Sequence, residues 1–118
     1  ALEQIDASHP LCLGWNTYDI RDEFYLKMKF HPKAKPILQV EVDGAKQTVA
    51  WVIDRADGGR SFGTTLGHFH DNFERTEFRR FLVNGILWSA KVDLPKSGAD
   101  VTIDPTRLKL DESKKPSN

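Results

Sequence analysis

Apolar and polar residues alternate strictly between residues 24 and 30. Every second side chain is apolar, and a tyrosine and two lysines occupy the positions between. Because successive side chains of a strand point to opposite faces, this pattern predicts a half-buried strand over residues 24–30. Its apolar face would consist of Phe24, Leu26, Met28 and Phe30.

Three further strand patterns follow, separated by turns that contain glycine. In Asp43-Gly44 and Asp57-Gly58-Gly59, glycine accepts a positive φ without steric cost. The run between these turns is apolar on both faces, which is typical of a central strand. The sequence therefore predicts an antiparallel meander of residues 36–43, 47–54 and 59–66.

A helical pattern begins soon after the meander. Asp71 and Glu74 have the spacing of a capping box, and Thr76 is a rival N-cap further along. Gly85 lies inside an otherwise apolar stretch, where it weakens the helix, so we expect it to allow close packing of this helix on a sheet. The apolar side chains at helical spacing, expected to form one face, are Phe78, Phe81, Leu82 and Ile86.

The remaining segments are less regular. Residues 1–20 predict a loop with short ordered pieces, residues 101–110 a short strand, and residues 111–118 a polar tail. One helix can cover only one face of a sheet of four strands, whereas layered domains have both faces covered. The chain also begins at Ala1, without Met or a signal-peptide pattern. We therefore expect a missing N-terminal half, or a second copy of the chain, to supply the other layer.

The charge balance limits the classes of partner. The 118 residues contain 17 basic and 17 acidic side chains, so the formal net charge is zero. Such a chain has no long-range field to attract nucleic acid or an anionic membrane, and no apolar run approaches the ~20 residues that span a bilayer. We expect neither partner. The single cysteine, Cys12, excludes an internal disulfide and is interpreted as a buried apolar group.

Three blocks of sequence resemble those of a known family in order and spacing. His9-Pro10-Leu11 precedes an acidic box, Asp22-Glu23-Phe24-Tyr25; residues 59–68 read GRSFGTTLGH, and residues 84–90 read NGILWSA. In these blocks the chain resembles the ThuA-like (trehalose utilisation) family, whose corresponding stretches read GRVFYTTLGH and NGILWA. The resemblance covers roughly residues 9–90.

The resemblance implies an α/β fold of the flavodoxin-like, class I glutamine amidotransferase-like type. This chain would be a partial domain, with residues 1–92 forming the C-terminal half of a ThuA-like domain and residues 93–118 a C-terminal extension. Ser61 and Gly63 depart from the family pattern, where valine and an aromatic residue are usual; they either widen a pocket or mark a bulge. Cys12 lacks the glycine-flanked context of an amidotransferase nucleophile, so that activity is not expected.

The resemblance also implies a carbohydrate or another small molecule as ligand. Trehalose-type sugars or their 3-keto derivatives would be converted, and we expect no cofactor. Two alternatives stay open. In the first, the chain is a non-catalytic sugar-binding or interaction module of a larger polypeptide. In the second, it is a metal-dependent hydrolase.

His68 is the first candidate for a catalytic group. It follows Gly67 at a strand end, where open α/β sheets bind ligands, and an imidazole exchanges protons near neutral pH. Glu23 is the second candidate, and Tyr25 would share its side of the predicted strand and bind hydroxyl groups. The alternatives are a structural histidine bonded to a loop carbonyl and a solvated strand end.

Asp22, Trp15 and His70 are further candidates for substrate binding. Asp22 precedes Glu23 and has a structural role as its alternative. Trp15 lies in a loop and could stack on a sugar ring, whereas Trp51 and Trp88 occupy apolar runs typical of a core.

Two other local patterns carry weaker signals. His68-Phe69-His70 would place two imidazoles on one side of an extended backbone, but a metal site needs a third ligand and none is assigned. Arg60 could bind an anion, although pairing with the nearby Asp57 is the expected arrangement.

Overall fold

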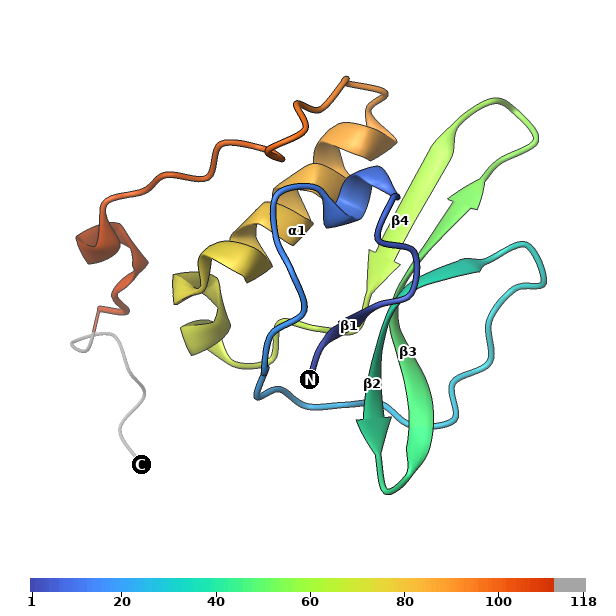
Figure 1. Ribbon diagram of the computed structural model, residues 1–118, viewed down its shortest axis with the longest axis horizontal. Helices are drawn as coiled ribbons and strands as arrows, with labels where there is room; N and C mark the ends of the chain where they lie inside the picture. The colour runs from blue at the N-terminus through green and yellow to red at the C-terminus, as the bar shows by residue number, and fades with distance from the viewer. Residues whose placement is uncertain (112–118) are drawn as a thin grey trace.

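The computed structural model describes residues 1–111 as an antiparallel sheet with one long helix against it (Figure 1). The strands pair in chain order, each antiparallel to the next. They are β1 (Glu3–Gln4), β2 (Lys35–Val42), β3 (Ala45–Asp54) and β4 (Arg60–Thr64). The helical elements are α1 (Thr76–Ser89) and three 3-10 turns, η1 (Pro10–Cys12), η2 (His70–Glu74) and η3 (Pro105–Leu108).

The predicted meander is confirmed. β2 and β3 are joined at Val42 and Ala45 by a two-residue turn, in which Asp43 has φ 50° and Gly44 has φ 78°. Two consecutive positive φ values define the type I′ hairpin turn that an Asp-Gly pair favours. β3 pairs with β4 in a continuous register. The first residues also match their prediction, as a loop with short ordered pieces, one of which adds β1 to the edge of the sheet.

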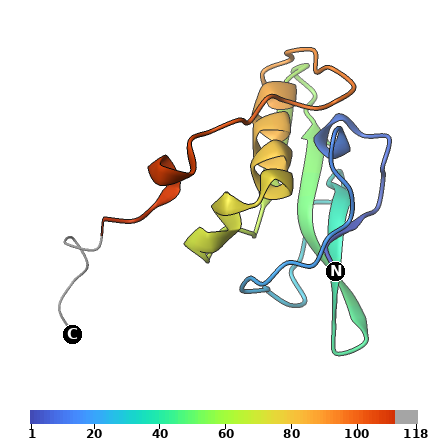
Figure 2. The ribbon, with the colours of Figure 1, turned by 60° about the vertical axis from the view of Figure 1, so that its left-hand side comes forward.

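Helix α1 lies against one face of the sheet (Figure 2). Its aromatic side chains pack into the core between the two. The rings of Phe62 on β4 and Phe81 on α1 meet edge to face, with centroids 5.5 Å apart. A Cβ atom at Gly85 would lie 2.5 Å from the Phe62 ring, so glycine is what allows this approach. The prediction for Gly85 is therefore confirmed. The prediction for Ile86 is wrong: the residue is 59% exposed, because the helix turns the side that carries Phe78 and Phe81 inward.

The other face of the sheet is partly covered by the chain itself. Trp51 and Gly63 are paired neighbours on β3 and β4, and they point away from the face that Phe62 occupies. A Cβ atom at Gly63 would lie 2.6 Å from the Trp51 indole, and Phe30 packs against this indole at 4.9 Å between ring centroids. Gly63 therefore makes room for Trp51 and marks neither an open pocket nor a bulge.

The strand predicted over residues 24–30 is not formed. Lys27 has φ 54°, outside the extended region, and its N–H group donates to the side chain of Gln47 at 3.0 Å instead of to a neighbouring strand. Tyr25, Leu26 and Met28 are exposed. This segment forms an irregular loop.

Two further predictions of local structure are wrong. α1 begins at Thr76 with Arg75 as N-cap and no side-chain cap, while Asp71 lies in η2 and makes no capping box. Residues 101–104 pair with no strand among residues 1–111 and lead into η3, whose first turn is capped by the Asp104 carboxylate. Residues 112–118 of the expected polar tail lie outside the described residues.

Side chains of α1 bind the backbone of two distant segments. Asn84 is fully buried; its amide donates to the carbonyls of Leu11 and Leu13 at 3.2 and 2.9 Å, and its oxygen accepts the N–H of Ala99 at 2.8 Å. Arg80 donates to the carbonyls of Ala99 and Gly14 at 3.1 and 2.9 Å. The N-terminal loop and the segment after α1 are thus joined through the helix.

Candidate functional site

The carboxylate of Asp22 shapes the loop that carries His68. It accepts backbone N–H groups from Gly67 at 2.8 Å, from His68 at 3.0 Å and from Glu23 at 2.8 Å. Gly67 has φ 117°, a conformation that favours glycine, and follows the end of β4. Since both carboxylate oxygens accept backbone N–H groups, Asp22 holds the acidic box and the loop of His68 together.

The clamp made by Asp22 brings His68 and Glu23 together. Nδ1 of His68 lies 2.9 Å from Oε2 of Glu23, and the two side chains are 52% and 45% exposed. A carboxylate can only accept, so this contact assigns the proton to Nδ1 and leaves the lone pair of a neutral imidazole on Nε2. The structure therefore unites the two predicted catalytic candidates as a solvent-accessible histidine–carboxylate pair.

Two neighbours of this pair were not predicted. The Phe69 ring meets the His68 ring edge to face at 4.8 Å, and the Arg21 guanidinium lies over Phe69, 4.5 Å from its centroid. The carbonyl of Arg21 accepts the amide of the buried Asn72 at 2.9 Å, which anchors the acidic box to η2. In the sequence, the position of Arg21 directly before Asp22 was the signal that could have placed it near the site.

The remaining predicted substrate-binding residues lie elsewhere or are occupied. Trp15 is only 5% exposed and its indole N–H donates to the Leu11 carbonyl at 2.8 Å, so it belongs to the core and has little ring surface for a sugar. A ring nitrogen of His70 contacts the carbonyl of Leu108, and the ring packs near Phe73. Tyr25 is half exposed on the irregular loop, and within residues 1–111 its hydroxyl makes no hydrogen bond.

The histidines do not share a metal-binding cluster in the described part of the chain. Among residues 1–111, no group of three or more His, Cys, Asp or Glu side chains is arranged to hold a metal ion. His68 turns to Glu23, whereas His70 turns to the C-terminal segment. The metal-dependent hydrolase alternative therefore has no ligand set in this part of the chain.

Two predictions about other side chains have opposite outcomes. Cys12 is buried as expected, and burial raises the pKa of its thiol to about 12. Arg60 does not pair with Asp57: its guanidinium lies over the Trp88 ring at 5.0 Å and donates to the Trp88 carbonyl at 3.3 Å, while Asp57 pairs with Arg55. The expected burial of Trp88 is confirmed.

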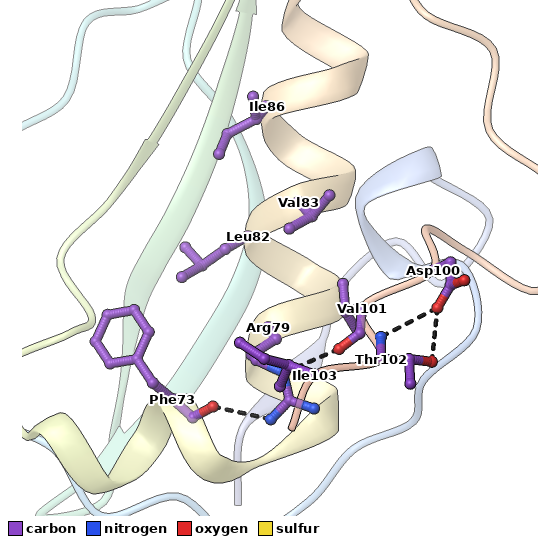
Figure 3. A pocket seen from close by; sticks show the side chains of 9 residues that line it. All are labelled: Phe73, Arg79, Leu82, Val83, Ile86, Asp100, Val101, Thr102 and Ile103. Carbon is purple, nitrogen blue, oxygen red and sulfur yellow. Dashed lines mark hydrogen bonds between the residues drawn. The ribbon is translucent and has the colours of Figure 1, made fainter. Parts of the chain in front are cut away.

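An apolar groove of about 360 Å³ lies beside α1 (Figure 3). One wall is the helix, and the other is the segment 100–103, held by Arg79, which donates to the Val101 carbonyl at 3.2 Å. The apolar residues that line the groove are Phe73, Leu82, Val83, Ile86, Val101 and Ile103.

Together, the fold and the site define a small α/β protein with an accessible histidine–carboxylate pair at the end of its edge strand. The chain belongs to the ThuA family, described as trehalose utilisation, whose model matches residues 1–89. This membership points to a carbohydrate-related role. No curated protein and no solved structure matches the chain. Within the described residues, no helix has the length and apolar character to cross a membrane.

Proposed function

We propose that this chain is the C-terminal half of a flavodoxin-like ThuA domain that acts on a carbohydrate, with His68 transferring a proton and Glu23 orienting it. The observation that carries the proposal is the 2.9 Å contact between Nδ1 of His68 and Oε2 of Glu23. The domain would extend to about residue 92. Trehalose-type sugars or their 3-keto derivatives are the proposed substrates.

The chemistry of the pair suits proton transfer on a sugar. With Nδ1–H donated to Glu23, Nε2 can accept a proton from a hydroxyl group or from a carbon next to a keto group. The Glu23 carboxylate would then stabilise the imidazolium that forms, and the Asp22 clamp would keep the two side chains in register. Tyr25, exposed and without a hydrogen-bond partner among residues 1–111, is available to orient a sugar hydroxyl.

The arrangement of the sheet supports the proposed half-domain. α1 covers one face, while the face with Trp51 is covered only in part, by the loop that carries Phe30. A flavodoxin-like domain has helices on both faces of its sheet. Parallel strands and crossover helices from the other half would complete the sheet, cover the face that carries Trp51 and close the site around His68.

Replacing Glu23 tests the proposed function directly. We expect Glu23→Gln to lower kcat of the full-length protein on its sugar substrate roughly 10–100-fold, because the amide keeps the shape but cannot stabilise the imidazolium. Glu41→Gln, at an exposed carboxylate on β2, is the matched control and should leave kcat unchanged. Trehalose and its 3-keto derivative would be followed by NMR. Equal kcat values in the two variants would contradict the role proposed for Glu23.

A second candidate function is that of an interaction module, which the apolar groove beside α1 favours. In the isolated chain a second copy would cover the groove. Ile86 is the most exposed of its apolar lining residues. We expect the 118-residue chain to self-associate and Ile86→Lys to shift it toward monomer by at least about tenfold in Kd, since a charge would be buried unpaired.

The control for this prediction is Ile5→Lys, at an exposed apolar side chain outside the groove. Sedimentation equilibrium over a concentration series measures both variants. A wild-type chain that stays monomeric throughout, or an equal effect of the two substitutions, would contradict a role for the groove.

A further inference from the structure

A second hollow lies at the end of the sheet opposite to His68. β2 begins there, β3 ends there, and β4 begins there, whereas His68 follows the other end of β4. The hollow has a volume of about 520 Å³. The residues that line it and can contact a polar ligand are His9, Lys33, Lys35, Asp54, Arg60 and Trp88.

Positive charge predominates among these residues. Two lysines and one arginine face a single carboxylate, that of Asp54. The Lys35 ammonium is engaged by Asp6 at 3.0 Å, but within residues 1–111 no ion pair is formed by the Lys33 ammonium. Arg60 donates one N–H group to the Trp88 carbonyl, at 3.3 Å, and its remaining donors have no partner among the described residues.

His9 adds a neutral donor to this hollow. Its Nδ1 accepts the N–H of Leu11 at 3.2 Å, as the N-cap of η1, so a neutral ring carries its proton on Nε2. Burial, and then the charge of Lys35, lower the pKa of His9, which favours the neutral ring. The ring is held edge to face against Trp88 at 5.0 Å. The hollow therefore offers donors from ammonium, guanidinium and imidazole groups.

We propose that this hollow binds an oxyanion, a phosphate or carboxylate group, either free or carried by a sugar. Donors that outnumber acceptors, with a net positive lining, match an acceptor-only ligand. The guanidinium of Arg60 is held in place by its contacts with Trp88, so little ordering is needed when the anion binds. The site is separate from the His68–Glu23 pair and does not depend on its proposed role.

Titration of the 118-residue chain tests the site. Inorganic phosphate, glucose 6-phosphate, gluconate and glucose are added at constant ionic strength, with chloride as the reference, and the Trp88 indole and Arg60 Nε–H signals are followed by NMR. We expect saturable shifts with the three anions and none with glucose. Tighter binding of glucose 6-phosphate than of phosphate identifies a sugar-borne anion, and equal binding a free one. Shifts that do not saturate, or that chloride reproduces, would overturn the proposal.

Charge substitutions give a test of sign. Lys33→Gln should weaken phosphate binding about two- to fivefold, the effect of one partly exposed charge, whereas Lys29→Gln removes the same charge outside the hollow and should have no effect. Asp54→Asn should strengthen binding by a similar factor, because it removes the one carboxylate of the lining. Weaker binding in Asp54→Asn, or equal effects of the two lysine variants, would exclude an anion site. His68→Ala should leave phosphate binding unchanged whatever its effect on turnover.

Discussion

Asn84→Leu is expected to lower the free energy of unfolding by about 2–4 kcal/mol. Leucine has the same branching and the same number of side-chain heavy atoms, but it removes three hydrogen bonds, two of them buried and one partly buried. The Leu11 carbonyl keeps a donor, the Trp15 indole at 2.8 Å, whereas the Leu13 carbonyl and the Ala99 N–H are left without their partner. Each unsatisfied buried group costs about 1–3 kcal/mol. Urea unfolding of the 118-residue chain measures the change.

A matched substitution separates this effect from the general effect of leucine. Asn16 is exposed, so Asn16→Leu should change stability by less than about 0.5 kcal/mol. Because the Ala99 N–H loses its acceptor in Asn84→Leu, this amide should also exchange hydrogen much faster than in the wild type. A loss below about 1 kcal/mol with Ala99 still protected would show that Asn84 does not hold the C-terminal segment.

The meander could be predicted because its information is local. The Asp43-Gly44 pair needs only its own backbone to specify a type I′ turn, and that turn sets the register of β2 against β3. Gly85 is similar, since a glycine in an apolar helical stretch indicates close packing before the partner, Phe62, is known.

The failed strand shows where local information ends. Alternation from residue 24 to residue 30 describes side chains but does not supply a neighbouring strand. Lys27 breaks the extended backbone, Phe24 packs against the core, and Phe30 packs on Trp51 at the other face of the sheet. The same limit applies to residues 101–104, which contact α1 and find no strand partner in the described part of the chain.

The candidate site was predicted as separate residues and not as an arrangement. His68 and Glu23 were each proposed from their places beside strand patterns, 45 residues apart along the chain. Asp22 unites them through backbone N–H groups, which every sequence contains and no sequence pattern marks. Asn84 was missed although it carried a signal, namely a polar amide within an apolar helical run that a buried hydrogen-bond network would explain.

His68→Ala is expected to lower kcat of the full-length protein on its sugar substrate by roughly 10²–10⁴-fold, the usual contribution of a positioned proton-transfer group. Its effect on stability should stay below about 1 kcal/mol, because the side chain is 52% exposed and its contact with Glu23 is a surface pair. His31→Ala removes an exposed imidazole from another loop and serves as the control for both measurements.

Trp88→Ala should show the opposite signature and so completes the test. Trp88 is a buried residue of α1 and contacts both His9 and Arg60, so its loss should cost about 3–5 kcal/mol through the cavity left behind. Unfolding curves and kcat are measured on the same preparations. If His68→Ala unfolds the protein while Trp88→Ala does not, our assignment of His68 to the site and of Trp88 to the core is wrong. If His68→Ala changes neither property, the chain is an interaction or binding module, and proton transfer lies elsewhere in the full-length protein.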